Sequence, residues 1–371
     1  MSKVLGIFFA DSHMAPRSWP SRPIQGDSYF AFECLVDLAI HHQVNLIGAG
    51  DLIDKQENRS ETIVRLYQQL DRLASHGLKL LYVQGQHELE QVPWLSGHPA
   101  TEHVSSRFFE LGGLNCYGLD YQPAGQLQLK LETVPVETDI LIAHQVWAEF
   151  MGTVTTPQGS MADVPHASIC FTGDLHEHRD VVVFGKTGQA ITLFSPGSTC
   201  MQAIDEPPDK FCFLLTQSRD GIKFVPSQLP TRPFIDWHPI NTEADMDAFV
   251  EKIRPRLDAV SAEAATRLPA HLCKPLLRVT YGSGVAELTS RVMPAVGDRA
   301  YVFFKETQAD KVEEAEIVVP TNGAAVTLES ALLGYLEARG FSSLESAALR
   351  LLQSHDINGE LQRLRAEALE V

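Results

Sequence analysis

Carboxylate, imidazole and amide side chains recur directly after apolar runs that have the length of β-strands. They stand, in chain order, at Asp11 with His13, Asp51, Gln86 with His87, His144, and Asp174 with His176. Any one of them alone is typical of a turn or of a hydrogen-bonded residue at the rim of a sheet. Because ligands of α/β sheets bind outside the carboxyl ends of the strands, we expect all these groups to emerge at the same sheet edge.

The types of these side chains indicate the chemistry. Carboxylate oxygens together with imidazole nitrogens suit Mn²⁺, Fe or Zn²⁺, and the absence of thiolates at these positions argues against a structural zinc site. Two cations ~3.5–4 Å apart need one shared carboxylate, and Asp51 is placed for that role. Such a pair of cations activates a water and neutralises charge on phosphoryl oxygens, so the pattern predicts phosphoester hydrolysis.

Alternating strand and helix patterns must position these residues. Helical periodicity predicts helices over 27–42 and about 60–76, between strands at 4–10, 44–49 and 80–84. This alternation is typical of βαβ units with right-handed crossovers. The chain then becomes richer in strands, which are predicted at 139–143, 168–172, 180–184, 190–194 and 210–217.

The composition shifts near residues 229–233, where we place the main domain boundary. The segment beyond it has the pattern of a small α+β domain, and from Leu328 onward only helical patterns remain. Its strands are expected at 276–281, 301–305 and 316–319, and its helices near 245–254 and 286–293.

The composition limits the class of protein. A chain of 371 residues is long enough for two or three domains. The net charge of −17 argues against a protein that coats nucleic acid, although bound cations would still allow a phosphodiester substrate. The six cysteines form no CxxC pair and are expected to be reduced, which favours a cytoplasmic protein. We expect neither a signal peptide in the run 4–10 nor a membrane span.

The ordered polar groups resemble a known family. Asp11-x-His13, Gly50-Asp51, Gly85-Gln86-His87-Glu88, His144 and Gly173-Asp174-x-His176 resemble, in order and spacing, the five motifs of calcineurin-like metallophosphoesterases. Asp27–Phe32, Asn58–Ser60 and Ser195–Ser198 are similar to segments of the SbcD-type nuclease subunits of DNA double-strand-break repair. The segment Lys274–Tyr281 is similar to the start of that family's DNA-capping domain, so the resemblance extends to about residue 320.

This resemblance implies a fold and its domains. The expected class is α/β, as a four-layer α/β/β/α metallophosphoesterase sandwich with a smaller α+β capping domain and a helical C-terminal tail. The domains would be residues 1–228 for the nuclease, 229–325 for the cap, and 326–371 for a helical extension. An apolar stripe in that extension, at Leu328, Leu332, Leu336, Leu351 and Leu352, could dock on a partner ATPase or fold back on the cap.

The resemblance also assigns roles to residues. Asp11, His13, Asp51 and His176 would hold the first metal, and Asp51, Gln86, His144 and Asp174 the second. His87 would be the catalytic histidine that positions the phosphate or protonates the leaving oxygen. The family usually has Asn at position 86 and His at position 174. Both replacements harden the second site, so of the two divalent ions expected we favour Mn²⁺, with Mg²⁺ as the alternative.

Basic residues flank the motifs. They could hold DNA phosphates or be ordinary solvated charges, and they are Arg17, Arg22, Lys55, Arg59 and Arg179. Other histidines match no ligand position, namely His98, His103, His166 and His178.

The resulting hypothesis is a metal-dependent DNA nuclease acting on duplex ends or single strands. The resemblance further implies DNA as a partner, a coiled-coil SMC-like ATPase of the SbcC type and a homodimer. Two alternatives remain open at this stage. One is a phosphodiesterase for small nucleotides, which would need no separate domain at 230–325. The other is a metal-poor pseudo-nuclease that acts as a DNA-end scaffold or inhibitor. The departures from the family pattern at Gln86 and Asp174 support this alternative.

Overall fold

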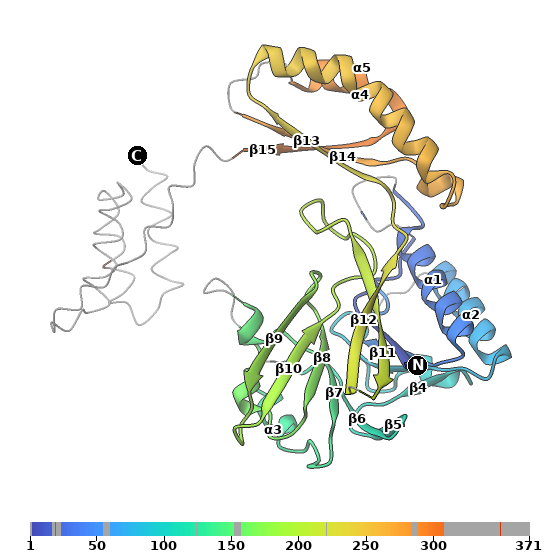
Figure 1. The fold of residues 1–371 in the computed structure, drawn as a ribbon, viewed down its shortest axis with the longest axis vertical. Helices are drawn as coiled ribbons and strands as arrows, with labels where there is room; N and C mark the ends of the chain where they lie inside the picture. The colour runs from blue at the N-terminus through green and yellow to red at the C-terminus, as the bar shows by residue number, and fades with distance from the viewer. Residues whose placement is uncertain are drawn as a thin grey trace, which may run out of the picture. The chain divides into compact units, whose positions relative to one another are not determined.

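The computed structural model describes residues 2–16, 19, 24–54, 60–123, 125–151, 157–219, 221–282, 288–307 and 349 (Figure 1). Residues 1–309 form one compact unit, which contains every element discussed below. The strand predicted at 316–319 lies outside the described residues, and so does the helical extension 326–371 apart from Leu349.

The first sheet carries the N-terminal motifs. Its six strands lie in the order β12-β11-β1-β2-β3-β4. Neighbours from β1 to β4 are parallel, as the βαβ pattern predicted, whereas β11 and β12 are added to β1 as an antiparallel pair. The strands are β1 (Lys3–Phe9), β2 (Leu46–Ala49), β3 (Leu80–Val83), β4 (Thr101–His103), β11 (Lys210–Ser218) and β12 (Gly221–Leu229).

The second sheet carries the later motifs. Its six strands lie in the order β5-β6-β7-β8-β10-β9, with parallel pairing from β6 to β10 and antiparallel pairs at both edges. The strands are β5 (Phe108–Leu111), β6 (Leu114–Leu119), β7 (Ile140–His144), β8 (Ile169–Gly173), β9 (Arg179–Phe184) and β10 (Ala190–Ser195).

Three apolar cores hold these layers together. Helices α1 (Asp27–His42) and α2 (Ser60–Ser75) bury Phe32 and Leu70 against the outer face of the first sheet. Phe8 and Phe171 pack edge to face between the two sheets, with ring centroids 5.0 Å apart. The outer face of the second sheet is covered around Trp147 by α3 (Leu127–Leu131) and short 3₁₀ turns. The predicted α/β/β/α sandwich is confirmed, although this last helical layer is thin.

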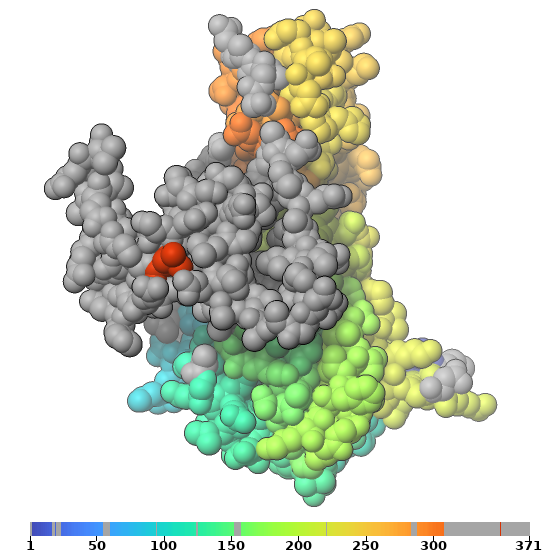
Figure 2. Space-filling model, turned by 90° about the vertical axis from the view of Figure 1, so that its left-hand side faces the viewer, coloured from blue at the N-terminus to red at the C-terminus, as the bar shows by residue number. Residues whose placement is uncertain are grey.

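A third, smaller sheet follows residue 229. Strands β13 (Phe234–Ile240), β14 (Leu276–Tyr281) and β15 (Tyr301–Glu306) are parallel and pack on α4 (Glu243–Ala264) and α5 (Leu288–Val296). Figure 2 shows residues of α4 (yellow) against those that follow residue 276 (orange).

Helix α4 is longer at its C-terminal end than the sequence predicted. The sequence pattern predicts a helix near 245–254, and a residue that precedes a proline, as Arg254 does, disfavours the α conformation. The helix nevertheless continues to Ala264, with Ile253 and Leu257 both buried in the core of this region. Among the described residues, no helix is long and apolar enough to cross a membrane. The three domain boundaries themselves stay a prediction.

Candidate metal centre

The predicted site residues come from both large sheets. Asp11, Asp51 and Gln86 follow β1, β2 and β3 of the first sheet, whereas His144 and Asp174 lie at the ends of β7 and β8 of the second. The expectation that all of them emerge at one sheet edge is therefore wrong. They meet because the carboxyl ends of parallel strands from the two packed sheets adjoin. The site therefore lies at the edge where β1–β3 of the first sheet and β7 and β8 of the second sheet end.

The backbone bends sharply at the motifs. Asp11, His13, Asp51 and Asp174 have φ angles of 51°, 42°, 49° and 84°, in the left-handed region that non-glycine residues seldom adopt. Each such residue costs on the order of 1–3 kcal/mol and persists only where the surrounding structure enforces it. Conformations of this kind cluster at functional sites, and here four of them coincide with predicted ligands.

Glycines allow the strand ends to approach closely. A Cβ added at Gly173 would collide with the carbonyl oxygen of Ala49 and the ring of His144. A Cβ at Gly50 would meet the same ring, and one at Gly85 would meet the carboxylate of Asp51. Gly50 and Gly173 are thus required by contacts between the two sheets, and Gly85 by the approach of neighbouring strand ends within the first sheet.

The first predicted ligand set is assembled around His13. Its Nε2 lies 3.1 Å from Nε2 of His176, a separation at which both nitrogens can contact one cation. The same Nε2 lies 3.8 Å from Oδ1 of Asp11 and 3.8 Å from Oδ2 of Asp51. Asp11, His13 and His176 together offer ligand atoms that all lie within 4.8 Å of one another.

The second set is centred on His144. Its Nδ1 donates a hydrogen bond of 2.7 Å to the carbonyl oxygen of Ala49, so Nε2 of the neutral ring carries no proton. That Nε2 lies 3.3 Å from Oδ2 of Asp51 and 3.6 Å from Oδ1 of Asp174. Oδ2 of Asp51 therefore faces imidazoles of both sets, which is the placement required of a shared carboxylate.

The two residues that depart from the family pattern contact each other. Nε2 of Gln86 donates a hydrogen bond to Oδ1 of Asp174. Oε1 of Gln86 is buried and has no hydrogen-bond partner among the described residues. The longer amide therefore reaches Asp174 with its nitrogen and keeps its oxygen available as a ligand.

The electrostatics of the cluster call for added positive charge. Burial raises the pKa of Asp11 to about 7 and lowers the pKa of His13 to about 3. Burial also opposes ionisation of Asp51, but His144, His13 and the backbone N–H of His87 together outweigh it and lower the pKa of Asp51 to about 2. Burial likewise opposes a charge on His144, yet Asp51, Asp174 and Asp11 raise its pKa well above its usual value.

The residues present fit a divalent-metal site. Oδ2 of Asp51 and Nε2 of His144 are buried and lack hydrogen-bond partners among the described residues. Unpaired buried polar atoms of this kind cost free energy unless a proton or a cation lies between them. Within the described part of the chain, no lysine or arginine forms an ion pair with Asp11, Asp51 or Asp174.

His87 lies at the mouth of this cluster. Its Nδ1 donates to the carbonyl oxygen of Asp54, and its Nε2 lies 3.8 Å from Oδ2 of Asp51. Its side chain is 37% exposed, whereas those of Asp51 and His144 are almost fully buried. A partly exposed imidazole beside buried ligands is in a position to contact a substrate. Asp54, which also lies near His13, was not among the predicted site residues.

The predicted DNA-binding residues are only partly described. Arg17, Arg22, Lys55 and Arg59 lie outside the described residues. Arg179 donates to the carbonyl oxygen of Phe150 and to Glu177 and is 46% exposed.

Three of the histidines that matched no ligand position make other hydrogen bonds. His98 pairs with Asp71, His103 pairs with Asp120, and His178 lies 2.7 Å from the carbonyl oxygen of Ser195.

Besides Asp54, two further residues near the site, Glu206 and Lys210, were not predicted from the sequence. Oε1 of Glu206 lies 2.8 Å from Nδ1 of His176, and Oε2 accepts a hydrogen bond of 2.8 Å from Lys210. Glu206 stands in the loop between β10 and β11, beyond the Ser195–Ser198 segment, where no local pattern indicated it.

Comparison with known proteins gives matches to DNA double-strand break repair proteins. No family model matches the chain. It is 25% identical over 245 residues to the DNA double-strand break repair protein Mre11 of Methanosarcina mazei, covering 61% of this chain and 38% of that protein. Over about three fifths of its length the chain is thus similar to an Mre11 protein.

Other Mre11 proteins give similar matches. The Mre11 protein of Methanosarcina acetivorans is 24% identical over 241 residues, 61% of this chain and 39% of that protein. The Mre11 protein of Sulfolobus acidocaldarius is 23% identical over 276 residues, 68% of this chain and 69% of that protein. The chain thus spans about two fifths of the length of the two Methanosarcina proteins. The resemblance to SbcD-type metallophosphoesterases is confirmed by these relatives.

Proposed function

We propose that the chain is a metal-dependent DNA nuclease that hydrolyses phosphodiesters at duplex ends or in single strands. The observation that carries the proposal is the convergence of the ordered motif residues on one buried cluster. Within it, Oδ2 of Asp51 and Nε2 of His144 face each other at 3.3 Å without hydrogen-bond partners among the described residues. Similarity to Mre11 proteins, which are named for DNA double-strand break repair, supports DNA as the substrate.

The proposed ligands form two sets that share Asp51. Asp11, His13 and His176 would complete the first set, while Gln86, His144 and Asp174 would complete the second. Oxygen-rich ligands in the second set favour Mn²⁺, with Mg²⁺ as the alternative. When bound, the two cations would supply an activated water and neutralise charge on the phosphoryl oxygens.

His87 would act on the substrate directly. Because its Nδ1 donates to the carbonyl oxygen of Asp54, the ring is held with Nε2 toward the cluster. A protonated His87 would then have an N–H at Nε2 to donate to a phosphoryl oxygen or to the leaving oxygen.

The proposed partners and compartment rest on the same similarity to Mre11 proteins. We propose a homodimer and a coiled-coil SMC-like ATPase of the SbcC type as partner, with residues 326–371 as the docking segment. Arg17, Arg22, Lys55, Arg59 and Arg179 remain the proposed DNA contacts. All six cysteines are free, which supports a reducing compartment such as the cytoplasm.

A nuclease assay tests the proposal. Linear duplex and single-stranded DNA are incubated with the parent protein and Mn²⁺, and the rates are compared with those of His87→Ala and of the control His76→Ala. His76 is an exposed histidine beyond α2, away from the motifs. We expect His87→Ala to lose at least ~10²-fold in rate, as removal of an acid–base or positioning group does.

Other outcomes would refute the proposal. Equal rates for the parent and His87→Ala would assign any cleavage to another site or to a contaminant. Cleavage of dinucleotides without cleavage of DNA would identify a phosphodiesterase for small nucleotides instead. Mn²⁺ binding without hydrolysis of either substrate would identify a DNA-end scaffold.

A further inference from the structure

Glu206 lies directly behind His176. The 2.8 Å contact joins Nδ1 of His176 to Oε1 of the carboxylate, which can only accept when ionised. Nδ1 therefore donates, and Nε2 of the neutral ring carries no proton and faces Nε2 of His13. Carboxylates behind metal-ligating histidines generally fix the ring in this way.

Lys210 holds the carboxylate in place. Its side chain is 3% exposed, and its ammonium group donates to Oε2 of Glu206 at 2.8 Å, to Oγ of Ser198 at 2.8 Å and to the carbonyl oxygen of His176 at 3.2 Å. All three N–H donors of the ammonium group are thus used. Oε2 also accepts from the backbone N–H of Gln202 at 3.0 Å. Lys210 binds both the backbone of His176 and the group that orients its ring.

The segment that carries Glu206 is also held from its other side. Arg278 of β14 donates to the carbonyl oxygen of Ile204 at 3.0 Å and to Asp205 at 3.3 Å. Met201 is buried in the same apolar cluster as Leu276, at the start of β14. Residues 201–206 therefore lie between the third sheet and His176. The side chain of Asp205 faces Arg278 of that sheet, and the next side chain, Glu206, faces His176.

We propose that Glu206 is a positioning residue that holds His176 in its metal-binding orientation, and that Arg278 supports the segment carrying it from the third sheet. The inference rests on the metal site proposed above. As a consequence, the affinity of the first ligand set for a metal ion depends on Arg278, which lies in the third sheet and not in the sandwich. Displacement of the third sheet would then weaken the metal site through residues 204–206.

A measurement without metal tests the first step. Imidazole ¹⁵N spectra of the metal-free parent at pH 9 are compared with those of Glu206→Ala, and His176 is assigned from the signal lost in His176→Gln. We expect His176 of the parent to carry its proton on Nδ1 and that of Glu206→Ala to carry it on Nε2. An unchanged tautomer in Glu206→Ala would overturn the positioning role.

Metal affinity tests the second step. Binding of Mn²⁺ to the full chain is titrated calorimetrically for the parent, Glu206→Ala, Glu206→Gln and Arg278→Met. We expect Glu206→Ala to bind about 10- to 100-fold more weakly, as loss of such a partner does elsewhere. Glu206→Gln keeps an oxygen that can accept from Nδ1 and should lose less. Arg278→Met should lose several-fold, because its contacts are one step further away.

The matched control is Asp209→Asn. Asp209 is an exposed acid of the same loop that accepts a hydrogen bond from Gln228, and its replacement should leave Mn²⁺ affinity unchanged. If Glu206→Ala does not fold, Glu206→Gln preserves the shape and must still bind more weakly than the parent. Parent-like affinity of both Glu206 variants would overturn the inference while leaving the nuclease proposal intact. Failure of the parent itself to bind Mn²⁺ would refute the proposed function, and the tautomer measurement would still decide the role of Glu206.

Discussion

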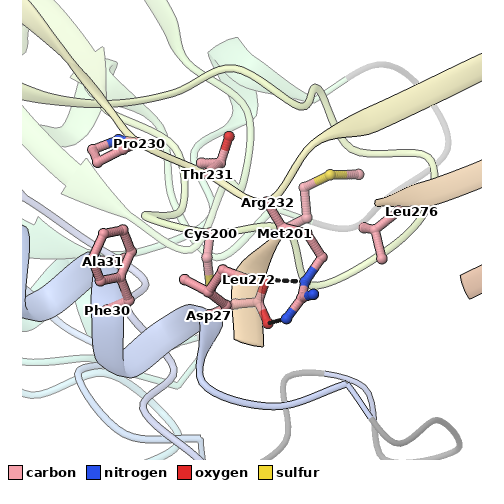
Figure 3. A pocket seen from close by; sticks show the side chains of 10 residues that line it. All are labelled: Asp27, Phe30, Ala31, Cys200, Met201, Pro230, Thr231, Arg232, Leu272 and Leu276. Atoms are coloured by element: carbon pink, nitrogen blue, oxygen red, sulfur yellow. Dashed lines mark hydrogen bonds and ion pairs between the residues drawn. The ribbon is translucent and has the colours of Figure 1, made fainter. Parts of the chain in front are cut away.

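Replacement of Arg232 is expected to cost considerable stability, although the residue lies outside the metal cluster. Its side chain is buried, and Figure 3 shows it facing Asp27 at the start of α1. Nε and Nη2 donate to the two carboxylate oxygens of Asp27 at 2.8 and 3.0 Å. The remaining donors reach the carbonyl oxygens of Gln25, His271 and Lys274 at 2.9–3.2 Å. All five guanidinium N–H groups are therefore used.

The expected cost follows from what the change would leave behind. Arg232→Met keeps an unbranched apolar stem but removes the guanidinium group, and so strands the carboxylate of Asp27, which is 10% exposed, and three carbonyl oxygens. Breaking one side of a buried ion pair costs about 3–5 kcal/mol. Because some water can reach Asp27, we expect about 3 kcal/mol of unfolding free energy to be lost.

Urea unfolding followed by tryptophan fluorescence measures this loss. Arg72→Met is the control, since Arg72 pairs with Asp37 on the surface and its loss should cost about 1 kcal/mol or less. Adding Asp27→Asn to Arg232→Met should restore part of the stability, because the stranded charge is removed. A loss for Arg232→Met no larger than that of the control would refute the reasoning.

Three further predictions concern the metal centre. Because Gln86 and Asp174 contact each other, the double variant Gln86→Asn, Asp174→His should bind Zn²⁺ better relative to Mn²⁺ than either single variant, in competition titrations. Mn²⁺ at about 100 times its dissociation constant should stabilise the EDTA-treated parent by about 2.7 kcal/mol, and Asp51→Asn should abolish that gain in thermal unfolding; an equal gain in Asp51→Asn would exclude Asp51 as a shared ligand. Gly173→Ala should lose Mn²⁺ binding through collision with the opposite sheet, whereas Gly97→Ala, which meets nothing within 4 Å, should bind normally in the same titration.

Local patterns predicted the elements well where a single helix or strand decides them. Helix α1 has the predicted bounds because its buried residues, such as Phe32, Leu35 and Val36, follow one face of the helix. Pairing was less accessible, because the partner of a strand is set by residues far away in the chain. The sequence around His144 does not indicate that β7 pairs with β6 and β8 and lies in a different sheet from β1–β3. That is why the site was placed at one sheet edge, although two sheets contribute to it.

The site shows the same division. The proposed ligands follow strand ends and have recognisable spacings, so Asp11, His13 and Asp51 could be proposed without a structure. Glu206 could not be found in this way, because its role depends on a loop folding back toward His176. The contact between Gln86 and Asp174 was equally hidden, since 88 positions separate the two residues. Two departures that looked independent in the sequence thus form one hydrogen-bonded pair.

Without bound cations, the cluster raises the free energy of the folded state. Four predicted ligands have left-handed backbone conformations, at on the order of 1–3 kcal/mol each. Asp11 and Asp51 add buried carboxylates whose only described ion-pair partners are imidazoles. A chain of net charge −17 gains nothing in stability from further negative charge in its interior. Divalent cations at this site would offset that cost and, in the same position, would give the proposed DNA substrate the positive charge that the chain as a whole lacks.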